Sequence, residues 1–171
     1  VSGSHFRKGW VRNRLLAYAF VFGRPWKSVR ELPKKSPDEA PRYVATFDVA
    51  PGEALLMKVG LSMTGADGAK RNLAADIPGW DFDAVRAAAR AKWNAILART
   101  TCEGTDDQKR NWYTALYHLY GQPNDYADAD GRFSAADAIV YASPDGTYRT
   151  TLSPWDTFRA AQPWYTLAAP E

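Results

Sequence analysis

The sequence predicts a two-part α+β chain in which antiparallel strands come first and helices follow. Three early stretches are rich in Val, Leu, Tyr and Phe, residues that suit the pleated surface of a sheet. No helical pattern separates these stretches, which favours antiparallel pairing over β-α-β units. Apolar residues then recur at steps of three and four, as on one face of a helix. This change of period places the boundary between the two parts near residues 63–80.

The predicted strands span residues 9–23, 42–49 and 54–62. Residues 24–41 separate the first two strands and carry several prolines and many charged side chains. Such a composition is typical of a surface loop, so a long loop is expected between these strands.

Two helices are predicted in the second part. The first begins after Asp81, a good N-cap residue, and ends at Arg99. Its apolar stripe consists of Phe82, Val85, Ala89, Trp93 and Ile96. The second begins at the T-x-x-Q capping box formed by Thr105 and Gln108, and it stops at Gly121. Its apolar stripe consists of Trp112, Leu116 and Leu119.

Residues 121–150 are rich in Gly, Asp, Ala and Tyr without a helical period, and they are named the 121–150 excursion below. Long ordered excursions are often functional. A short hairpin is expected at 139–148, around a turn at 144–146. A third helix is predicted from Ser153, which can cap it, with Pro154 at the first helical position.

Charge and composition exclude several classes of protein. Of 171 residues, 46% are hydrophobic, as in a folded protein, and the net charge is +3. Residues 1–50 are basic, but their charges are spread without a cluster larger than the pairs Arg7-Lys8 and Lys34-Lys35, so they predict a solvated face and no nucleic-acid site. The single cysteine, Cys102, forms neither an internal disulfide nor a metal pattern. No apolar run is long enough for a membrane span, and no signal peptide is present.

Two other residue patterns have plain structural interpretations. Residues 126–137 partly resemble a calcium loop, but Tyr126 stands where the first ligand is needed, so acids that cap their own turns are favoured. His118 lies beside the apolar stripe of its helix, which indicates a hydrogen-bonded histidine in a core or interface.

Carboxylates remain as candidates for chemistry, because hydrolysis of a glycosidic bond needs two of them. The candidates are Asp125, Asp128, Asp130, Asp137, Asp145 and Asp156. Asp156 has two interpretations that the residues leave open. It can cap the third helix, since an acid is favoured at a helix N-terminus, or it can accept hydrogen bonds from sugar hydroxyls beside Trp155.

Four segments, in this order and spacing, resemble glycoside hydrolase family 92, the exo-acting α-mannosidases. They read GAKRNL from Gly68, IPGWDFDAVR from Ile77, WYTALYH from Trp112 with DADGR from Asp128, and WDTFRAAQP from Trp155. Pro154 and Gln162 depart from the family pattern, in which an aliphatic residue and a histidine are usual.

The resemblance implies a domain plan. Residues 1–63 would end an N-terminal β-sandwich, residues 64–104 would form a linker with a helix, and residues 105–171 would begin an (α/α)₆ catalytic barrel. The chain is then an internal fragment whose partner is the rest of the catalytic domain. The alternative is a stand-alone, non-catalytic carbohydrate-binding module. A periplasmic or secreted location is suggested by the resemblance alone.

The resemblance also implies a reaction. Family members remove terminal mannose from glycans with inversion and with calcium, and an α-1,2 linkage is the expected substrate. The acid, the base and the calcium ligands are expected beyond this chain, so no catalytic or metal-binding residue is expected within it. Asp156 is expected to contact the terminal mannose, with Trp155 and Arg159 as neighbours in the substrate site.

Overall fold

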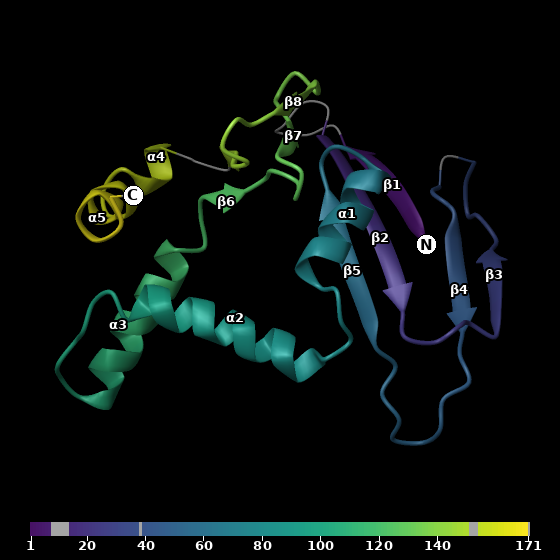
Figure 1. Ribbon diagram of the computed structural model, residues 1–171, viewed down its shortest axis with the longest axis horizontal. Helices are drawn as coiled ribbons and strands as arrows, with labels where there is room; N and C mark the ends of the chain where they lie inside the picture. Colours follow the sequence, from purple (N-terminus) through teal and green to yellow (C-terminus); the bar gives the residue numbers. More distant parts are fainter. Residues whose placement is uncertain (8–13, 38, 151–153, 171) are drawn as a thin grey trace.

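The computed structural model describes residues 1–7, 14–37, 39–150 and 154–170. These residues form antiparallel sheets and five helices, in a mixed α+β arrangement (Figure 1). Strands β1 to β5 gather at one end of the molecule and helices α3 to α5 at the other, and the short strands β6 to β8 lie between them. The predicted order of strands first and helices later is therefore confirmed, with short strands added in the 121–150 excursion.

The main sheet has three antiparallel strands in the order β1-β2-β5. They are β1 (Ser2–Arg7), β2 (Arg14–Phe22) and β5 (Met57–Ser62). Strands β2 and β5 confirm the predictions at 9–23 and 54–62, except that residues 9–13 lie outside the described residues. The sequence missed β1, because its Ser and Gly residues have weak β-propensity and the strand is ordered by pairing with β2.

Helix α1 (Ala66–Asp76) covers one face of this sheet. Its residues Ala69 and Leu73 are buried against the sheet. Gly60 of β5 makes this close packing possible, because a Cβ there would overlap the carbonyl oxygen of Ala69 and lie 2.7 Å from Leu73 Cβ. The backbones of α1 and β5 therefore touch without an intervening side chain.

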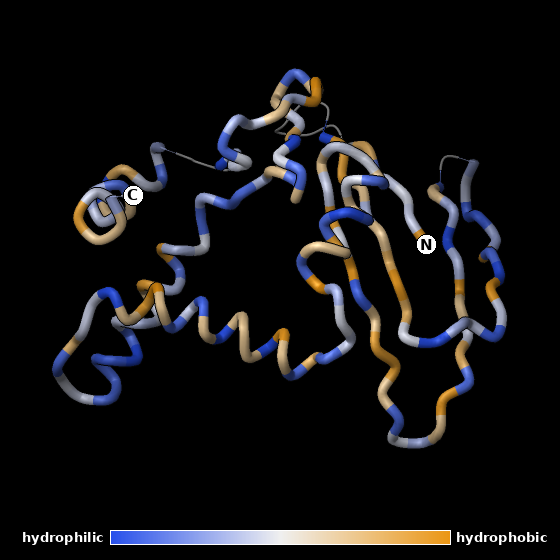
Figure 2. Tube along the Cα trace, viewed as in Figure 1, coloured by the Kyte–Doolittle hydropathy of each residue, from blue (hydrophilic) through white to orange (hydrophobic). Residues whose placement is uncertain are grey.

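The opposite face of the sheet carries large apolar side chains. The register pairs Tyr18 with Leu61 and Phe20 with Val59, so these four residues point to the side away from α1. Leu61 is 53% exposed. Figure 2 shows the apolar colour along β2 and β5. The sheet thus has one face covered by a helix and one apolar face that no described residue covers fully.

A second pair of strands consists of β3 (Ser28–Leu32) and β4 (Arg42–Thr46). Strand β4 confirms the prediction at 42–49. The long loop expected at 24–41 was wrong in part, because β3 lies within it. The missed strand is polar and largely exposed, so it lacks the alternation that marks a half-buried strand; it is held by pairing with β4.

Helices α2 (Phe82–Leu97) and α3 (Asp106–Leu119) confirm the two predicted helices and their caps. The Asp81 carboxylate accepts a hydrogen bond from Ala84 N at 2.9 Å, and Thr105 and Gln108 form the reciprocal capping box. No residue of α2 is buried, and Phe82 is 65% exposed. His118 is also exposed in α3, so the core alternative for this histidine was wrong, while the interface alternative stays a prediction. None of the helices in the described ranges is long and apolar enough to cross a membrane.

The 121–150 excursion contains two short pairs of strands. Strand β6 (Asn124–Asp125) pairs with β9 (Arg149–Thr150), and β7 (Arg132–Ser134) pairs with β8 (Val140–Ala142). A turn does lie at 143–146, where Gly146 N donates to Ser143 O at 3.2 Å. The hairpin expected at 139–148 was nevertheless wrong, because the segments that flank the turn pair with strands earlier in the chain.

The chain ends in two short helices, α4 (Pro154–Thr157) and α5 (Ala161–Ala168). The start of the third predicted helix at Pro154 is confirmed, while its proposed cap, Ser153, lies outside the described residues. The single helix that the sequence indicated is split at residues 158–160. Pro163 explains the split, because its ring would clash with the carbonyl of Arg159 in a continuous helix.

We expect Gly60→Ala to destabilise the protein by about 1–3 kcal/mol, since the added methyl group must push α1 away from β5. Gly79→Ala is the matched control, because a Cβ at Gly79 meets no atom within 4 Å. Urea unfolding of both variants measures the difference. Equal midpoints for the two would contradict the close packing described above.

Candidate functional site

The segment of Trp155, Asp156 and Arg159 forms a short helical turn at the surface. Pro154 presets the backbone for the first helical position, and Phe158 N closes the turn by donating to Pro154 O at 3.0 Å. Trp155 is 76% exposed, and Asp156 beside it is exposed as well. A large ring and a carboxylate on adjacent residues are therefore both exposed to solvent at the start of α4.

Arg159 lies just after this turn and contacts the ring of Phe158. Its guanidinium carbon is 5.5 Å from the ring centroid, a cation–π geometry. Both residues are exposed. The three predicted site residues are thus all exposed, within one segment of five residues that includes part of α4.

Helix α5 anchors this segment to α3 from its C-terminal side. Tyr165 Oη lies 2.6 Å from Leu119 O and 2.7 Å from Gln122 O, and its single proton serves both carbonyl oxygens. Trp164 Nε1 donates to Tyr120 Oη at 3.1 Å. Burial between the two helices raises the pKa of Tyr165, and neighbouring Tyr120 adds to the rise. These contacts fix α5 on α3, and they therefore anchor the segment of α4 at its C-terminal side.

The strands β6 and β9 bring the two ends of the 121–150 excursion together. Tyr126 N donates to Tyr148 O at 2.7 Å, and Tyr148 N donates to the Asp125 carboxylate at 3.1 Å. The excursion therefore leaves for α4 from the place where it entered (Figure 1).

Asp128 fastens the excursion to the main sheet and to α1. The Asp128 cluster consists of Asp128, Ser62, Thr64 and Asn72. Only 3% of Asp128 is exposed. Its carboxylate accepts hydrogen bonds from Ser62 Oγ at 2.8 Å, from Asn72 Nδ2 at 2.8 Å and from Thr64 Oγ1. A buried carboxylate is costly unless such donors surround it, so this cluster specifies one position for the excursion.

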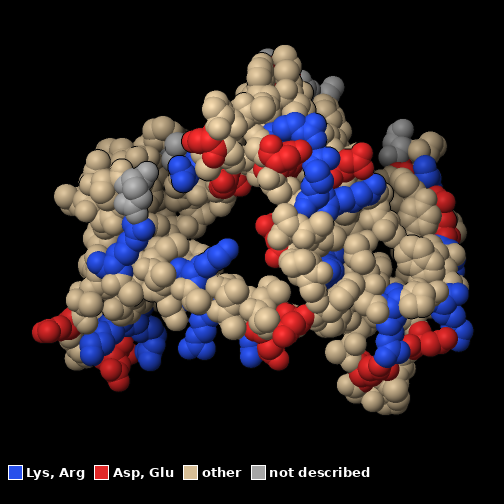
Figure 3. Space-filling view, in the orientation of Figure 1, with Lys and Arg blue, Asp and Glu red and all other residues tan. Residues whose placement is uncertain are grey.

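Two further residues of the excursion, Asp130 and Tyr126, make contacts beside the cluster. Asp130 pairs with Arg71 of α1 at 2.9 Å and with Arg132 at 2.9 Å. The Arg132 guanidinium is the main cause that lowers the pKa of Asp130. Arg14 of β2 donates to Tyr126 Oη. Figure 3 shows acidic and basic side chains gathered where the excursion meets α1, above an open hollow that α2, the sheet and the excursion border.

The expectation that the acids of residues 126–137 cap their own turns is confirmed at Asp130 and Asp137 and is wrong at Asp128, whose carboxylate binds side chains of other elements. Asp137 accepts from Ile139 N at 2.9 Å and from Tyr141 Oη at 2.8 Å, and these bonds lower its pKa. Asp145 accepts from Ser143 Oγ at 2.5 Å and from Thr147 N at 3.1 Å. The Ser143 bond is the main cause that lowers the pKa of Asp145 to about 2.

The structure separates the predicted site from a cleft beside the main sheet. A cleft of about 570 Å³ lies between β5, α1 and residues 125–129, and Trp155, Asp156 and Arg159 are not among its lining residues. The carboxylates of Asp125 and Asp128 in its wall already accept hydrogen bonds. We therefore place the candidate site at α4. The cleft is interpreted as part of the contact between the excursion, β5 and α1.

The role of Asp128 is not evident from the sequence. Asp128 is one of six acids that are possible catalytic groups there, and nothing local sets it apart from Asp130. Its partners lie 56 to 66 residues earlier in the chain, so no spacing rule connects them. The only signal was the position of Asp128 in a segment that carried the family resemblance.

No group of three or more His, Cys, Asp or Glu side chains within residues 1–7, 14–37, 39–150 and 154–170 could hold a metal ion. The oxygens of Asp128 also face hydrogen-bond donors, which a cation would repel.

Comparison with known proteins identifies the family. A model of the glycosyl hydrolase family 92 catalytic domain matches residues 68–171. The matched description is that of a glycoside hydrolase, and because the match covers more than half of the chain, the chain belongs to family 92 of that class. No curated protein matches the chain.

Solved structures agree with this assignment. The family GH92 α-mannosidase BT3965 from Bacteroides thetaiotaomicron is 26% identical over 96% of this chain, with a TM-score of 0.85, and it has also been solved with mannoimidazole. The family GH92 inverting mannosidase BT2199 from the same species is 25% identical over 96% of the chain, with a TM-score of 0.81. The chain covers 24% of each of these two structures, so it spans about a quarter of their length.

We expect the carboxyl carbon shift of Asp145 to titrate with a midpoint near pH 2, and Ser143→Ala to raise that midpoint toward 3.8. Because the folded-state pKa lies below the unfolded value, the contribution of this carboxylate to folding is complete above that unfolded value and is lost as the pH falls toward 2. An unchanged midpoint in Ser143→Ala, measured by NMR, would contradict the assigned cause.

Proposed function

We propose that this chain is part of an inverting exo-α-mannosidase that removes terminal mannose from glycans, with α-1,2-linked mannose as substrate. Membership of family 92 supports the reaction class. The observation that carries the role of this chain is the exposed pair of Trp155 and Asp156 at the start of α4. An indole ring matches the C–H face of a pyranose, and a carboxylate accepts hydrogen bonds from sugar hydroxyls.

In this proposal, Asp156 binds hydroxyl groups of the terminal mannose and Trp155 limits its position beside them. Arg159 stands behind the turn on the ring of Phe158 and supports the local conformation. These residues orient the sugar; they do not transfer protons. Inversion needs an acid and a base on opposite sides of the bond, about 6.5–9.5 Å apart, and we assign both to parts of the protein outside this chain.

Calcium is part of the proposed reaction, but its ligands are not expected in this chain. The described residues do not fit a calcium site, because they offer no cluster of three metal-binding side chains. Calcium prefers six to eight oxygen ligands. We therefore assign the ion to the catalytic domain outside this chain and derive no step through it.

The uncovered apolar surfaces support the proposal that this chain is part of a larger enzyme. Leu61 on the sheet and Phe82 on α2 are both more than half exposed, and isolated soluble domains rarely expose broad apolar faces. We propose that residues 1–63 end a β-sandwich, that 64–104 link it, and that 105–171 begin an (α/α)₆ barrel. The same surfaces argue against a stand-alone carbohydrate-binding module.

We expect Asp156→Asn in the full-length protein to lower kcat/KM for α-1,2-mannobiose about 10- to 100-fold, the loss that follows from about 1.5–3 kcal/mol of charge-assisted hydrogen bonding. Release of mannose measures the effect.

Asp107→Asn is the matched control, because Asp107 is also an exposed acid in the first turn of a helix and pairs locally with Arg110 at 2.6 Å. If both variants retain the wild-type kcat/KM, Asp156 does not contact the sugar. Mannose release from the reducing end or the interior of a longer glycan would instead overturn the exo-acting assignment.

A further inference from the structure

We propose that Asp128 is a positioning residue, which places the Trp155–Arg159 segment by locking the 121–150 excursion onto β5 and α1. This inference rests on the proposed role of Asp156 in binding the sugar. Asp128 is a buried carboxylate that the proposed reaction does not otherwise use. Its function is to position the segment that follows the excursion.

The hydrogen bonds of the Asp128 cluster join three separate parts of the chain. Ser62 ends β5, Thr64 precedes α1, and Asn72 lies within α1. Asn72 Nδ2 donates both to Asp128 and to Leu61 O, at 2.8 Å each, while Asn72 Oδ1 accepts from Ala129 N at 2.7 Å. One amide thus binds the side chain of the excursion, its backbone and the sheet together.

The packing around the carboxylate leaves little room for movement. Gly68 lies in the first turn of α1 and is buried. A Cβ at Gly68 would overlap the Asp128 carboxylate and Ser62 Oγ, and would lie 2.6 Å from Thr64 Oγ1. The carboxylate therefore fills a space that α1 leaves open by having no side chain there. The partial positive charge of the helix N-terminus favours an anion at this place.

Three alternate residues of the excursion, at 126, 128 and 130, contact the sheet or α1. Tyr126 binds Arg14, Asp128 binds its cluster, and Asp130 pairs with Arg71. Only the middle contact is buried, so it carries the strongest geometric constraint. Exposed ion pairs such as Arg71–Asp130 contribute little by comparison.

The number of residues between β9 and α4 limits how far α4 can lie from the Asp128 cluster. Strand β9 ends at Thr150, paired with Asn124 only four residues before Asp128. Helix α4 begins at Pro154, and four steps of chain span at most about 14 Å. On its other side, α5 is bound to α3 through Tyr165. The site segment therefore runs between two anchors, and loosening the Asp128 anchor lets it turn about the α5 anchor alone.

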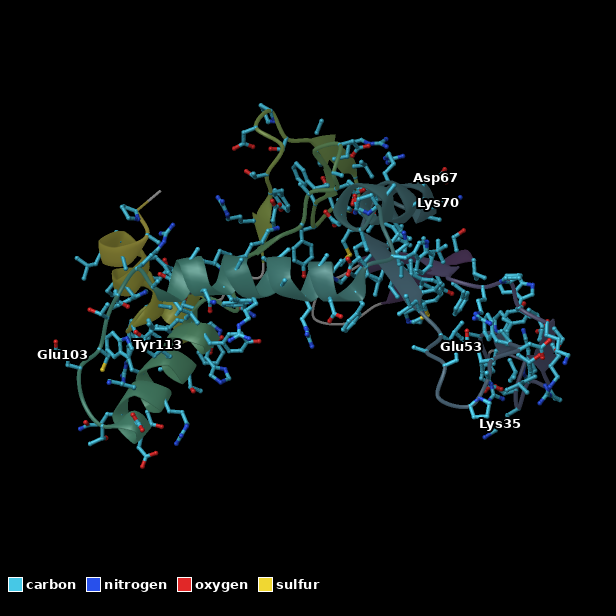
Figure 4. All side chains as sticks on the ribbon, turned by 60° about the horizontal axis from the view of Figure 1, so that its bottom comes forward. Lys35, Glu53, Asp67, Lys70, Glu103 and Tyr113 are labelled. Atoms are coloured by element: carbon cyan, nitrogen blue, oxygen red, sulfur yellow. The ribbon has the colours of Figure 1, made fainter. Side chains whose placement is uncertain are left out.

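A double-mutant cycle in the full-length protein tests this inference. Asp128→Asn and Asp156→Asn are made singly and together, and kcat/KM for α-1,2-mannobiose is measured with thermal unfolding for each. Asp67→Asn is the control, because Asp67 is an exposed acid of α1 whose partner, Lys70, lies on the same helix at 3.0 Å (Figure 4).

We expect Asp128→Asn to lower kcat/KM about tenfold when Asp156 is present and less than about twofold when it is absent, while Asp67→Asn leaves kcat/KM unchanged. Independent, multiplying effects of the two substitutions would overturn the positioning role. If Asp156→Asn itself has no effect, the proposed sugar contact fails instead. If Asp128→Asn does not fold, Ser62→Ala, which removes one donor and keeps the carboxylate, replaces it; coupling of about threefold is then expected, and its absence overturns the inference.

Discussion

The architecture of this chain depends on the close contact between α1 and β5. Gly60 lets the two backbones touch, and the Asp128 carboxylate then occupies the gap beside Gly68. Both glycines lie on the same interface, one on each element. A side chain at either position would move the helix, and the groups that hold the 121–150 excursion would move with it.

This constraint organises the molecule as two groups of elements joined twice. Helix α2 makes the first connection, and it does so without a buried residue of its own. The excursion makes the second by returning from α3 to the sheet, where its acids meet β5 and α1 (Figure 1). The chain therefore closes on itself around the central hollow seen in Figure 3. The structural role of the otherwise irregular excursion is therefore to connect α3 back to the main sheet.

The candidate site takes its geometry from that return path. Trp155 and Asp156 lie on a four-residue helix, too short to hold its own direction. Its neighbours supply the direction: α5 packs on α3, and the excursion is fixed at Asp128. The position of a sugar-binding carboxylate at Asp156 would depend on Asp128, more than 25 positions away in sequence. Residues outside the W-D-T-F-R motif would therefore help to position the sugar site.

The sequence alone determined the features that arise from neighbouring residues. The caps at Asp81 and Thr105, the helices that follow them, and the start of α4 at Pro154 all depend on contacts within one or two turns, and the structure confirms them. The family was also evident from ordered local motifs. Tertiary structure decided which strands pair, why polar β1 and β3 are strands at all, and which of six similar aspartates is buried. These outcomes depend on partners tens of residues distant, whose proximity exists only after the chain has folded.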